Sequence, residues 1–185
     1  MKKILVCSPT YNESENIKIF CKKIFNINKN LNLLIIDDNS PDKTYEIVKN
    51  LKKKSKNLHL IKRKGKLGLG SAIREGITYA LKKKYDALIT LDADLSHDPK
   101  EIPNLIKNLK SNDFIIGSRY INGGSSDYVG YRDLISRLAN KLMSQIAKDT
   151  HQDPAPLDNS YDYCAFGLSS NRTKYNKASG QHYNE

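Results

Sequence analysis

The sequence predicts an α/β protein with a mostly parallel β-sheet flanked by helices. From residue 3 to residue 118, short apolar runs alternate with longer amphipathic stretches, which is the pattern of a repeated strand–helix unit. In the longer stretches, apolar residues recur at helical spacing with lysines on the opposite side. Repeated units of this kind build a parallel sheet with helices on both of its faces.

Five strands and four helices are expected in this region. The apolar runs predict strands at Ile4 to Ser8, Leu33 to Asp37, Leu58 to Ile61, Ala87 to Leu91 and Phe114 to Gly117. The amphipathic stretches between them predict helices at Glu13 to Phe25, Thr44 to Lys54, Ser71 to Lys83 and Pro99 to Leu109. The fourth helix has the clearest start, because Asp98 is a suitable cap and proline fits the first helical turn.

The length of 185 residues suits one domain with a substantial core. We place that domain at residues 1–148 and separate from it a divergent tail at residues 149–185, whose low apolar content predicts poor order unless it docks. No run reaches the ~18 to 20 apolar residues of a membrane span. The apolar run that follows Met1 is too short for a secretory signal, so a cytoplasmic protein is expected.

The cysteines are few, odd in number and widely spaced: Cys7, Cys21 and Cys164. No close pair of them suggests zinc or redox chemistry. Because Cys7 and Cys21 lie in apolar strand and helix patterns, we expect them to be buried, reduced thiols.

The chain is basic, with a net charge of +11. Residues 149–185 hold three Lys or Arg against five Asp or Glu, so residues 1–148 carry +13. Lysine clusters mark the ends of expected elements, where they stabilise helix carboxyl ends and keep the surface soluble. A basic surface also favours contact with anionic lipid headgroups, by about 1 kcal/mol per Lys or Arg. No nucleic-acid-binding motif accompanies the charge, so no nucleic acid is expected as a partner.

Two carboxylates one residue apart, Asp92 and Asp94, follow the apolar run Ala87 to Leu91. Side chains two positions apart on an extended segment point the same way, so both can face one cation. Mg²⁺ and Mn²⁺ accept such hard oxygen ligands and complete their shells with water and substrate phosphates. An Asp-x-Asp pair is also common where a strand simply exits into a loop, so the pair alone leaves both interpretations open.

Polar segments follow the other expected strands as well. The carboxyl ends of parallel strands meet at one edge of the sheet, where open α/β sheets bind their ligands. We therefore expect these segments to converge on one crevice, with a nucleotide read by the early loops and its diphosphate held by a metal and by Arg119. They are Pro9 to Glu13, Asp37 to Thr44, Asp92 with Asp94, and Ser118 to Tyr120.

The motifs together resemble glycosyltransferase family 2, and within it the dolichol-phosphate or polyprenol-phosphate mannosyltransferases. The resemblance covers about residues 3 to 147 in the correct order and spacing. Two details, Ser40-Pro41-Asp42 and Leu95-Ser96-His97, favour the polyprenol-phosphate branch. The segments that carry the resemblance are Pro9 to Glu13, Ile36 to Asp42, Gly68 to Ala72, Asp92 to His97 and Gly117 to Tyr120.

The resemblance implies a GT-A fold and a role for particular residues. Asp92, Asp94 and Ser96 would belong to the site of a Mg²⁺ or Mn²⁺ ion, and Asp92, Asp94 and Arg119 would be the catalytic residues. Arg119 and Arg132 would lie near the donor diphosphate or the acceptor phosphate. The residues implied in contact with the nucleotide-sugar donor are Pro9, Tyr11, Glu13, Ile36, Asp38, Asp92, Ala93, Asp94, Arg119 and Arg132.

The implied reaction is metal-dependent, inverting transfer of mannose from GDP-mannose to a polyprenyl phosphate, a dolichyl-type lipid. The departing diphosphate gains negative charge, which a metal and an arginine can stabilise. Because the phosphate acceptor is already an anion, no strong general base is needed. We accordingly interpret His97 as a turn or helix-start residue and not as a base.

The lipid acceptor implies a peripheral position on the cytosolic face of a membrane, through direct contact or through a membrane-anchored partner. Residues 120–132 are rich in turn formers and fit either a mobile cover over the site or a plain surface connection. Arg132 to Lys148 predicts an amphipathic helix that packs on the core. Gly65, Gly68 and Gly70 do not match a phosphate-binding fingerprint, and the resemblance implies that Gly68 and Gly70 belong to a tight strand-to-helix turn.

Two alternatives stay open. One is a family 2 transferase that uses a UDP-sugar and a saccharide or other lipid acceptor, which would need a carboxylate base for a neutral hydroxyl. The other is a nucleotide-sugar binding protein without turnover. It is suggested by the tail, where Cys164 to Gly167 does not match the Ser-Gly-Phe-Arg type motif that family members carry.

Overall fold

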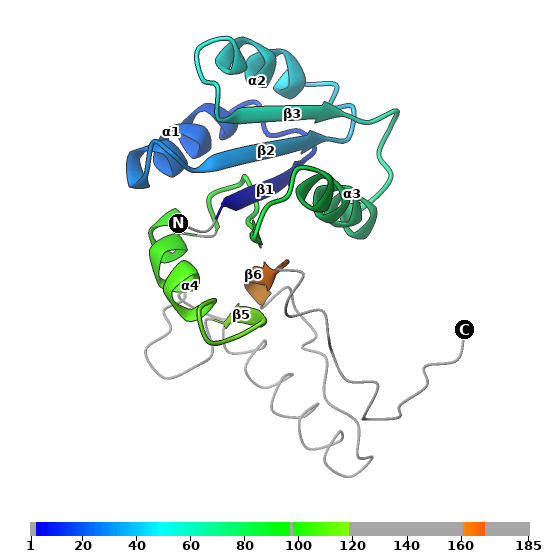
Figure 1. Cartoon of the computed structure of the whole chain (residues 1–185). Coiled ribbons are helices and arrows are strands. Elements are labelled where there is room, and N and C mark those ends of the chain that lie inside the picture. The colour runs from blue at the N-terminus through cyan, green and yellow to red at the C-terminus, as the bar shows by residue number, and fades with distance from the viewer. Residues whose placement is uncertain (1–2, 97, 119–160, 169–185) are drawn as a thin grey trace, which may run out of the picture. The chain divides into compact units, whose positions relative to one another are not determined.

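A computed structural model of the chain describes residues 3–96, 98–118 and 161–168. Its centre is a six-stranded sheet in the order β3-β2-β1-β4-β6-β5 (Figure 1). The strands are β1 (Ile4–Thr10), β2 (Asn32–Asp37), β3 (Leu58–Lys62), β4 (Ala87–Thr90), β5 (Phe114–Ser118) and β6 (Tyr161–Gly167). The helices are α1 (Ile17–Ile27), α2 (Thr44–Lys52), α3 (Leu69–Lys82), the short 3₁₀ helix η1 (Pro99–Glu101) and α4 (Ile102–Asn108).

Strand β1 is central and pairs in parallel with β2 on one side and β4 on the other, and β2 pairs in parallel with β3. In this register Cys7 lies opposite Leu34 and Thr90. The helices form the connections between the parallel strands, which confirms the predicted α/β fold with a mostly parallel sheet.

The sheet and α3 share an apolar core. Because alternate residues of a strand face the same side, Leu5 and Cys7 of β1 pack in one cluster with Leu34 and Ile36 of β2. The buried alanines of α3 complete that layer, together with Tyr85 and Leu88. Val6, which alternation directs to the opposite face, is also fully buried, so both faces of β1 are covered.

Gly76 permits the close approach of α3 to β1. A Cβ atom at this position would lie 2.6 Å from the Cys7 sulfur, well inside the distance that real Cβ atoms adopt. Burial, with a smaller contribution from Glu75, raises the pKa of the Cys7 thiol to about 12. Cys7 and Cys21 are both buried free thiols, as predicted.

Two boundaries differ from the predicted ones for physical reasons. Helix α1 begins at Ile17 instead of Glu13, because Asn12 has a left-handed φ of +62° and Glu13 carbonyl oxygen accepts bonds from the Asn16 and Ile17 amides in a turn. Pro99 starts a 3₁₀ turn before α4, and the Asp98 side chain caps it by accepting a bond from the Lys100 amide, as its sequence suggests.

Strand β6 was not predicted. It pairs antiparallel with β4, with Leu88 opposite Phe166. The Gly167 amide donates to the Asp113 carbonyl at 2.8 Å, and the Phe114 and Phe166 rings lie 4.9 Å apart. Residues 149–185 were expected to be poorly ordered unless they dock, and this segment docks by pairing with β4. The domain boundary at residue 148 stays a prediction.

Contacts divide the chain into two compact units, Met1–Ile115 with Cys164–Glu185 and Ile116–Tyr163. The described part of the second unit is limited to the ends of β5 and β6, residues 116–118 and 161–163. The segment predicted as a mobile element, residues 120–132, and the helix predicted at Arg132 to Lys148 lie outside the described residues. Among the described helices, none combines the length and apolarity that crossing a membrane requires.

We expect Gly76→Ala to destabilise the fold by about 1 to 3 kcal/mol, because the added methyl group overpacks the contact with Cys7. Urea denaturation measures the loss, and Cys7→Ala in the same chain should recover part of it by removing the sulfur. Gly70→Ala, where an added Cβ meets nothing within 4 Å, is the control and should be neutral or stabilising. Equal losses at Gly70 and Gly76 would contradict the packing argument.

Candidate functional site

The candidate site lies at the carboxyl edge of the parallel strands, where the loops after β1, β2 and β4 begin. Asp37, the last residue of β2, bonds to the end of β1 and to the loop after β2. Its buried carboxylate accepts bonds from the Thr10 hydroxyl at 3.2 Å and from the Ser40 hydroxyl and amide at 2.6 and 3.0 Å. Asp37 therefore has a structural role, because its carboxylate joins the end of β1 to the loop after β2.

A second set of bonds joins the β1–α1 loop to the β2–α2 loop. The Asn12 amide donates to Ser40 Oγ at 3.1 Å, the Glu13 amide to Thr44 Oγ1 at 2.9 Å, and the Ser14 amide to Asp42 Oδ2 at 2.9 Å. Although burial opposes ionisation of Asp42, bonds from Thr44 and Ser14 lower its pKa to about 2. The two loops are therefore held together by two neutral bonds and by the charge-assisted Ser14–Asp42 bond, which is of a stronger kind.

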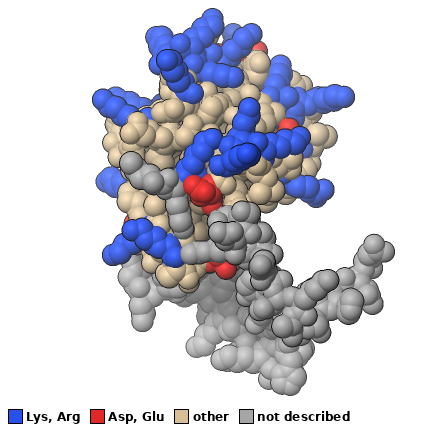
Figure 2. Space-filling model, in the orientation of Figure 1, with Lys and Arg blue, Asp and Glu red and all other residues tan. Residues whose placement is uncertain are grey.

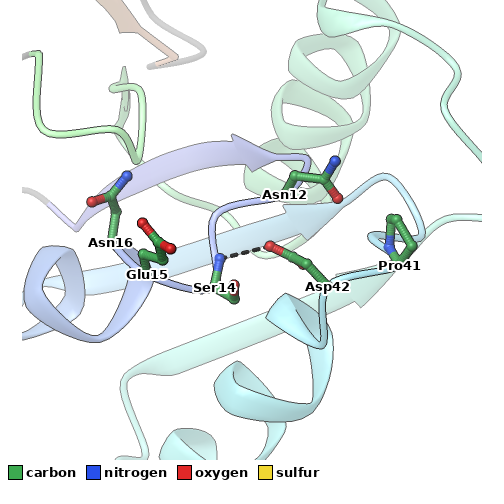
Figure 3. A pocket seen from close by; sticks show the side chains of 6 residues that line it. All are labelled: Asn12, Ser14, Glu15, Asn16, Pro41 and Asp42. Atoms are coloured by element: carbon green, nitrogen blue, oxygen red, sulfur yellow. Dashed lines mark hydrogen bonds between the residues drawn. The ribbon is translucent and has the colours of Figure 1, made fainter.

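These two loops line an open surface cavity of about 500 Å³. Figure 3 shows the Ser14–Asp42 bond at its wall, with Asn16 on the side of α1 and Asn12 on the opposite side of the pocket. The lining is polar and includes two carboxylates, so the cavity suits a polar ligand. Its residues are Asn12, Ser14, Glu15, Asn16, Pro41 and Asp42.

Asp38 has both of its carboxylate oxygens bonded inside the protein. Oδ1 accepts a bond from Arg63 Nη1 at 2.6 Å, and Oδ2 accepts bonds from the amides of Leu67 and Gly68 at 3.0 and 3.2 Å. Asp38 and Arg63 are both buried. The predicted donor residue therefore also fixes the segment that leads from β3 into α3.

Arg63 is the centre of this network, and it was missed in the sequence. Its guanidinium also contacts the Gly68 carbonyl at 3.3 Å, the Ser71 hydroxyl, and the Glu75 carboxylate at 3.3 Å from Nε. A planar fork with several donors suits such a set of acceptors better than a lysine would. The sequence did not distinguish Arg63 from Lys62 and Lys64, because the three residues form one basic cluster.

The charges of Asp92 and Asp94 affect the pKa of the Glu13 carboxyl group. Burial is the largest cause that raises the pKa of its carboxyl, and repulsion from Asp94, Asp42 and Asp92 adds to it, against a lowering bond from Asn16 Nδ2 at 3.1 Å. Carboxylates from the loops after β1, β2 and β4 thus share one electrostatic environment, as the convergence of strand ends predicts.

The Asp92 to Ser96 segment has the alternation expected of two outward carboxylates. Ala93 is buried, while Asp92 is partly exposed and Asp94 exposed. Asp94 Oδ1 accepts bonds from the Ser96 amide at 2.9 Å and from its hydroxyl at 2.7 Å, and the place of Ser96 at a metal site stays a prediction. Within the described residues, no three His, Cys, Asp or Glu side chains are placed to hold a metal ion by themselves.

The remaining predicted donor residues differ in what they offer. Pro9 and Ile36 are partners in the β1–β2 register, and the Ile36 side chain is buried in the core, which leaves its main chain for any contact with a ligand. Tyr11 is exposed, and Lys66 Nζ lies 4.2 Å from the centre of its ring. His97, Arg119 and Arg132 lie outside the described residues, so their predicted roles stay predictions.

Comparison with known proteins gives a family match over most of the chain. The family model described as glycosyl transferase family 2 matches residues 5–171. A dolichol-phosphate mannosyltransferase of Pyrococcus furiosus is 40% identical over 139 residues, which are 73% of this chain and 38% of that protein. A polyprenol monophosphomannose synthase of Mycolicibacterium smegmatis is 34% identical over 142 residues, 75% of this chain and 54% of that protein. The chain thus spans about half or less of the length of these relatives.

Solved structures share the fold at lower identity. A mannosyltransferase from Pyrobaculum calidifontis, in complex with GDP-Man and Mn²⁺, superposes with a TM-score of 0.57 at 19% identity, covering 90% of this chain and 44% of that one. Glucosyl-3-phosphoglycerate synthase from Mycobacterium tuberculosis, in complex with Mn²⁺, UDP and phosphoglyceric acid, gives 0.58 at 19% identity, covering 90% and 56%. These likenesses confirm the GT-A fold class.

We expect Arg63→Met to cost about 3 to 5 kcal/mol of stability, because it leaves the Asp38 carboxylate buried without its cation. Chemical denaturation measures the loss, and adding Asp38→Asn should recover part of it by removing the uncompensated charge. Arg74→Met on the exposed side of α3 is the matched control. A loss below 1 kcal/mol in Arg63→Met, or an equal loss in the control, would contradict the assignment.

We expect Glu13→Gln to be more stable than the natural chain at neutral pH. The raised pKa means that the folded state disfavours the charged form, so ionisation of Glu13 lowers stability as the pH rises through its unfolded and then its folded pKa. Denaturation from pH 3 to pH 7 should show the two chains converging at low pH, where both side chains are neutral. The exposed Glu15→Gln serves as the control; an advantage of Glu13→Gln that grows toward acid pH would reverse the predicted sign.

Proposed function

This chain belongs to glycosyl transferase family 2, and from that premise we propose that it transfers mannose from GDP-mannose to a polyprenyl phosphate with inversion at the sugar. The observation that carries the proposal is the parallel pairing of β1 with β2 and β4, which brings the loops with Glu13 and the Asp92–Asp94 pair to one edge of the sheet. These acidic residues lie next to loops whose backbone geometry is fixed by Asp37, Asp38 and Asp42. Relatives with 34 to 40% identity are named as mannosyltransferases acting on dolichol or polyprenol phosphates.

The donor nucleoside would bind at the ends of β1 and β2, with Pro9, Tyr11, Glu13, Ile36 and Asp38 around it. Tyr11 offers an exposed ring on which a base can stack. Asp38 is held in place by Arg63 and by two backbone amides. Such preorganised polar groups bind without the cost of being ordered first.

The donor diphosphate would lie at Asp92, Ala93 and Asp94. Two outward carboxylates separated by a buried alanine are hard oxygen donors that fit Mg²⁺ or Mn²⁺, and a bound ion would neutralise charge on the diphosphate as it leaves. The Ser96 amide and hydroxyl orient Asp94 through its Oδ1 atom. We propose that Arg119 and Arg132 supply positive charge to the departing or accepting phosphate.

The acceptor would attack without a protein base. A polyprenyl phosphate oxygen is ionised at neutral pH, so no proton has to be removed from it. The negative charges of Glu13, Asp92 and Asp94 repel the donor diphosphate and the acceptor phosphate. A bound metal ion and the two arginines would offset this repulsion. The lipid acceptor implies peripheral action at the cytosolic face of a membrane.

We expect Asp94→Asn to lower the rate of mannose transfer by roughly 100-fold or more, because a preorganised charge at the diphosphate is lost. The assay follows labelled mannose from GDP-mannose to a short polyprenyl phosphate with Mg²⁺ or Mn²⁺. Asp98→Asn, which keeps a capping side chain four residues further on, is the control and should retain transfer.

Other results of this assay would favour other functions. Transfer from a UDP-sugar to a saccharide, with none from GDP-mannose, would establish the other type of family 2 transferase. Binding of GDP-mannose without transfer would leave a nucleotide-sugar binding protein. Equal rates in Asp94→Asn and the natural chain would overturn the role of the Asp-x-Asp pair.

A further inference from the structure

The segment that joins β3 to α3 carries the most exposed large apolar side chains of the described residues. Leu67 is 59% exposed and Leu69 is 55% exposed. Both belong to residues 64–70, which we call the β3–α3 segment; it leads from the β3 arrow down to α3 in Figure 1. Apolar side chains of this size next to each other at a turn indicate a surface that a partner covers.

The same segment is cationic and has no acidic residue. Lys64 and Lys66 are exposed beside the two leucines, whereas Arg63, directly before them, is buried against Asp38. Figure 2 shows many Lys and Arg side chains and few acidic ones over the face in view. Lysines around exposed leucines are the combination that recognises anionic lipid headgroups above an apolar layer.

The backbone groups of Leu67 and Gly68, in the middle of the segment, are bonded within the protein. The amides of Leu67 and Gly68 donate to Asp38 Oδ2 at 3.0 and 3.2 Å. Their carbonyl oxygens accept the Ser71 hydroxyl at 2.7 and 2.8 Å, and the Gly68 carbonyl also accepts the Ala72 amide at 3.2 Å. A backbone polar group without a partner is costly in an apolar medium, so these bonds lower the cost of moving Leu67 and Gly68 out of water.

The segment begins at the same edge of the sheet as the candidate site. The Arg63 amide donates to the Asp37 carbonyl at 2.8 Å, and Lys66 reaches the ring of Tyr11. A surface that contacts lipid here would bring the carboxyl edge toward the headgroups, where the phosphate of a polyprenyl phosphate lies.

We propose that the β3–α3 segment is a docking surface for an anionic lipid bilayer. Leu67 and Leu69 enter the interface, and Lys64 and Lys66 bind headgroup phosphates. The inference deepens the proposed function, because it rests on an acceptor that is a bilayer lipid. A second copy of the chain is disfavoured as the occupant, since a two-fold interface would place the same lysines opposite one another.

Sedimentation of the full chain with vesicles tests this surface. We expect the natural chain to bind phosphatidylcholine vesicles that contain phosphatidylglycerol, to bind pure phosphatidylcholine less, and to lose binding as salt screens the charges. Leu67→Ser with Leu69→Ser should lower vesicle binding roughly tenfold or more, because two apolar side chains no longer enter the lipid. Lys64→Gln with Lys66→Gln should remove most of the dependence on phosphatidylglycerol.

The matched control is Ile19→Ser with Leu81→Ser, which removes side chains of similar exposure, 50% and 54%, from α1 and from the end of α3. Vesicle binding unchanged in this control supports the assignment. Unchanged binding in the Leu67 and Leu69 variant, or an equal loss in the control, overturns it. A leucine variant that changes only the oligomeric state, measured by light scattering, also overturns it in favour of a second copy.

Transfer to a short, water-soluble polyprenyl phosphate tests the proposed function separately. Transfer by a chain that binds no vesicles overturns the docking surface and leaves the function standing. Vesicle binding that depends on the leucines, in a chain that transfers no sugar, overturns the function and supports the surface.

Discussion

The parallel pairing of β1 with both β2 and β4 is the constraint on which the rest of the structure depends. It fixes the ends of three strands in one register, so that Thr10, Asp37 and Leu91 leave the sheet at the same edge. Gly76 lets α3 pack closely on the same strand. Within the described residues, the loops of the candidate site follow either β1 itself or a strand that pairs with β1.

Side-chain acceptors then convert a common edge into a defined site. Asp37 accepts a bond from the end of β1, Asp42 from the loop after β1, and Asp38 from Arg63 and the segment after β3. Because loop backbone needs partners when it is partly buried, these carboxylates set the shape of the loops. Asp94, by contrast, keeps an exposed position, with its Oδ1 bonded to the neighbouring Ser96.

The proposed bilayer surface and the site share one part of this network. The Asp38–Arg63 pair holds the β3–α3 turn through the amides of Leu67 and Gly68 and the Gly68 carbonyl. A single buried ion pair therefore links the loop expected to read the nucleotide with the segment proposed to contact lipid. Removing one partner of such a buried pair is costly, so the pair fixes the position of the two neighbouring loops.

The sequence by itself determined the α/β fold, the five strands with apolar runs, and the convergence of Asp92 and Asp94 with the early loops, because local periodicity and strand direction are written in short stretches of chain. Only the tertiary structure decided the inward turn of Arg63, the crowding of Cys7 by Gly76, and the insertion of β6 beside β4. These three depend on partners distant in the chain. A basic residue, a glycine and a polar tail segment carry no local signal of what they will meet once the sheet has formed.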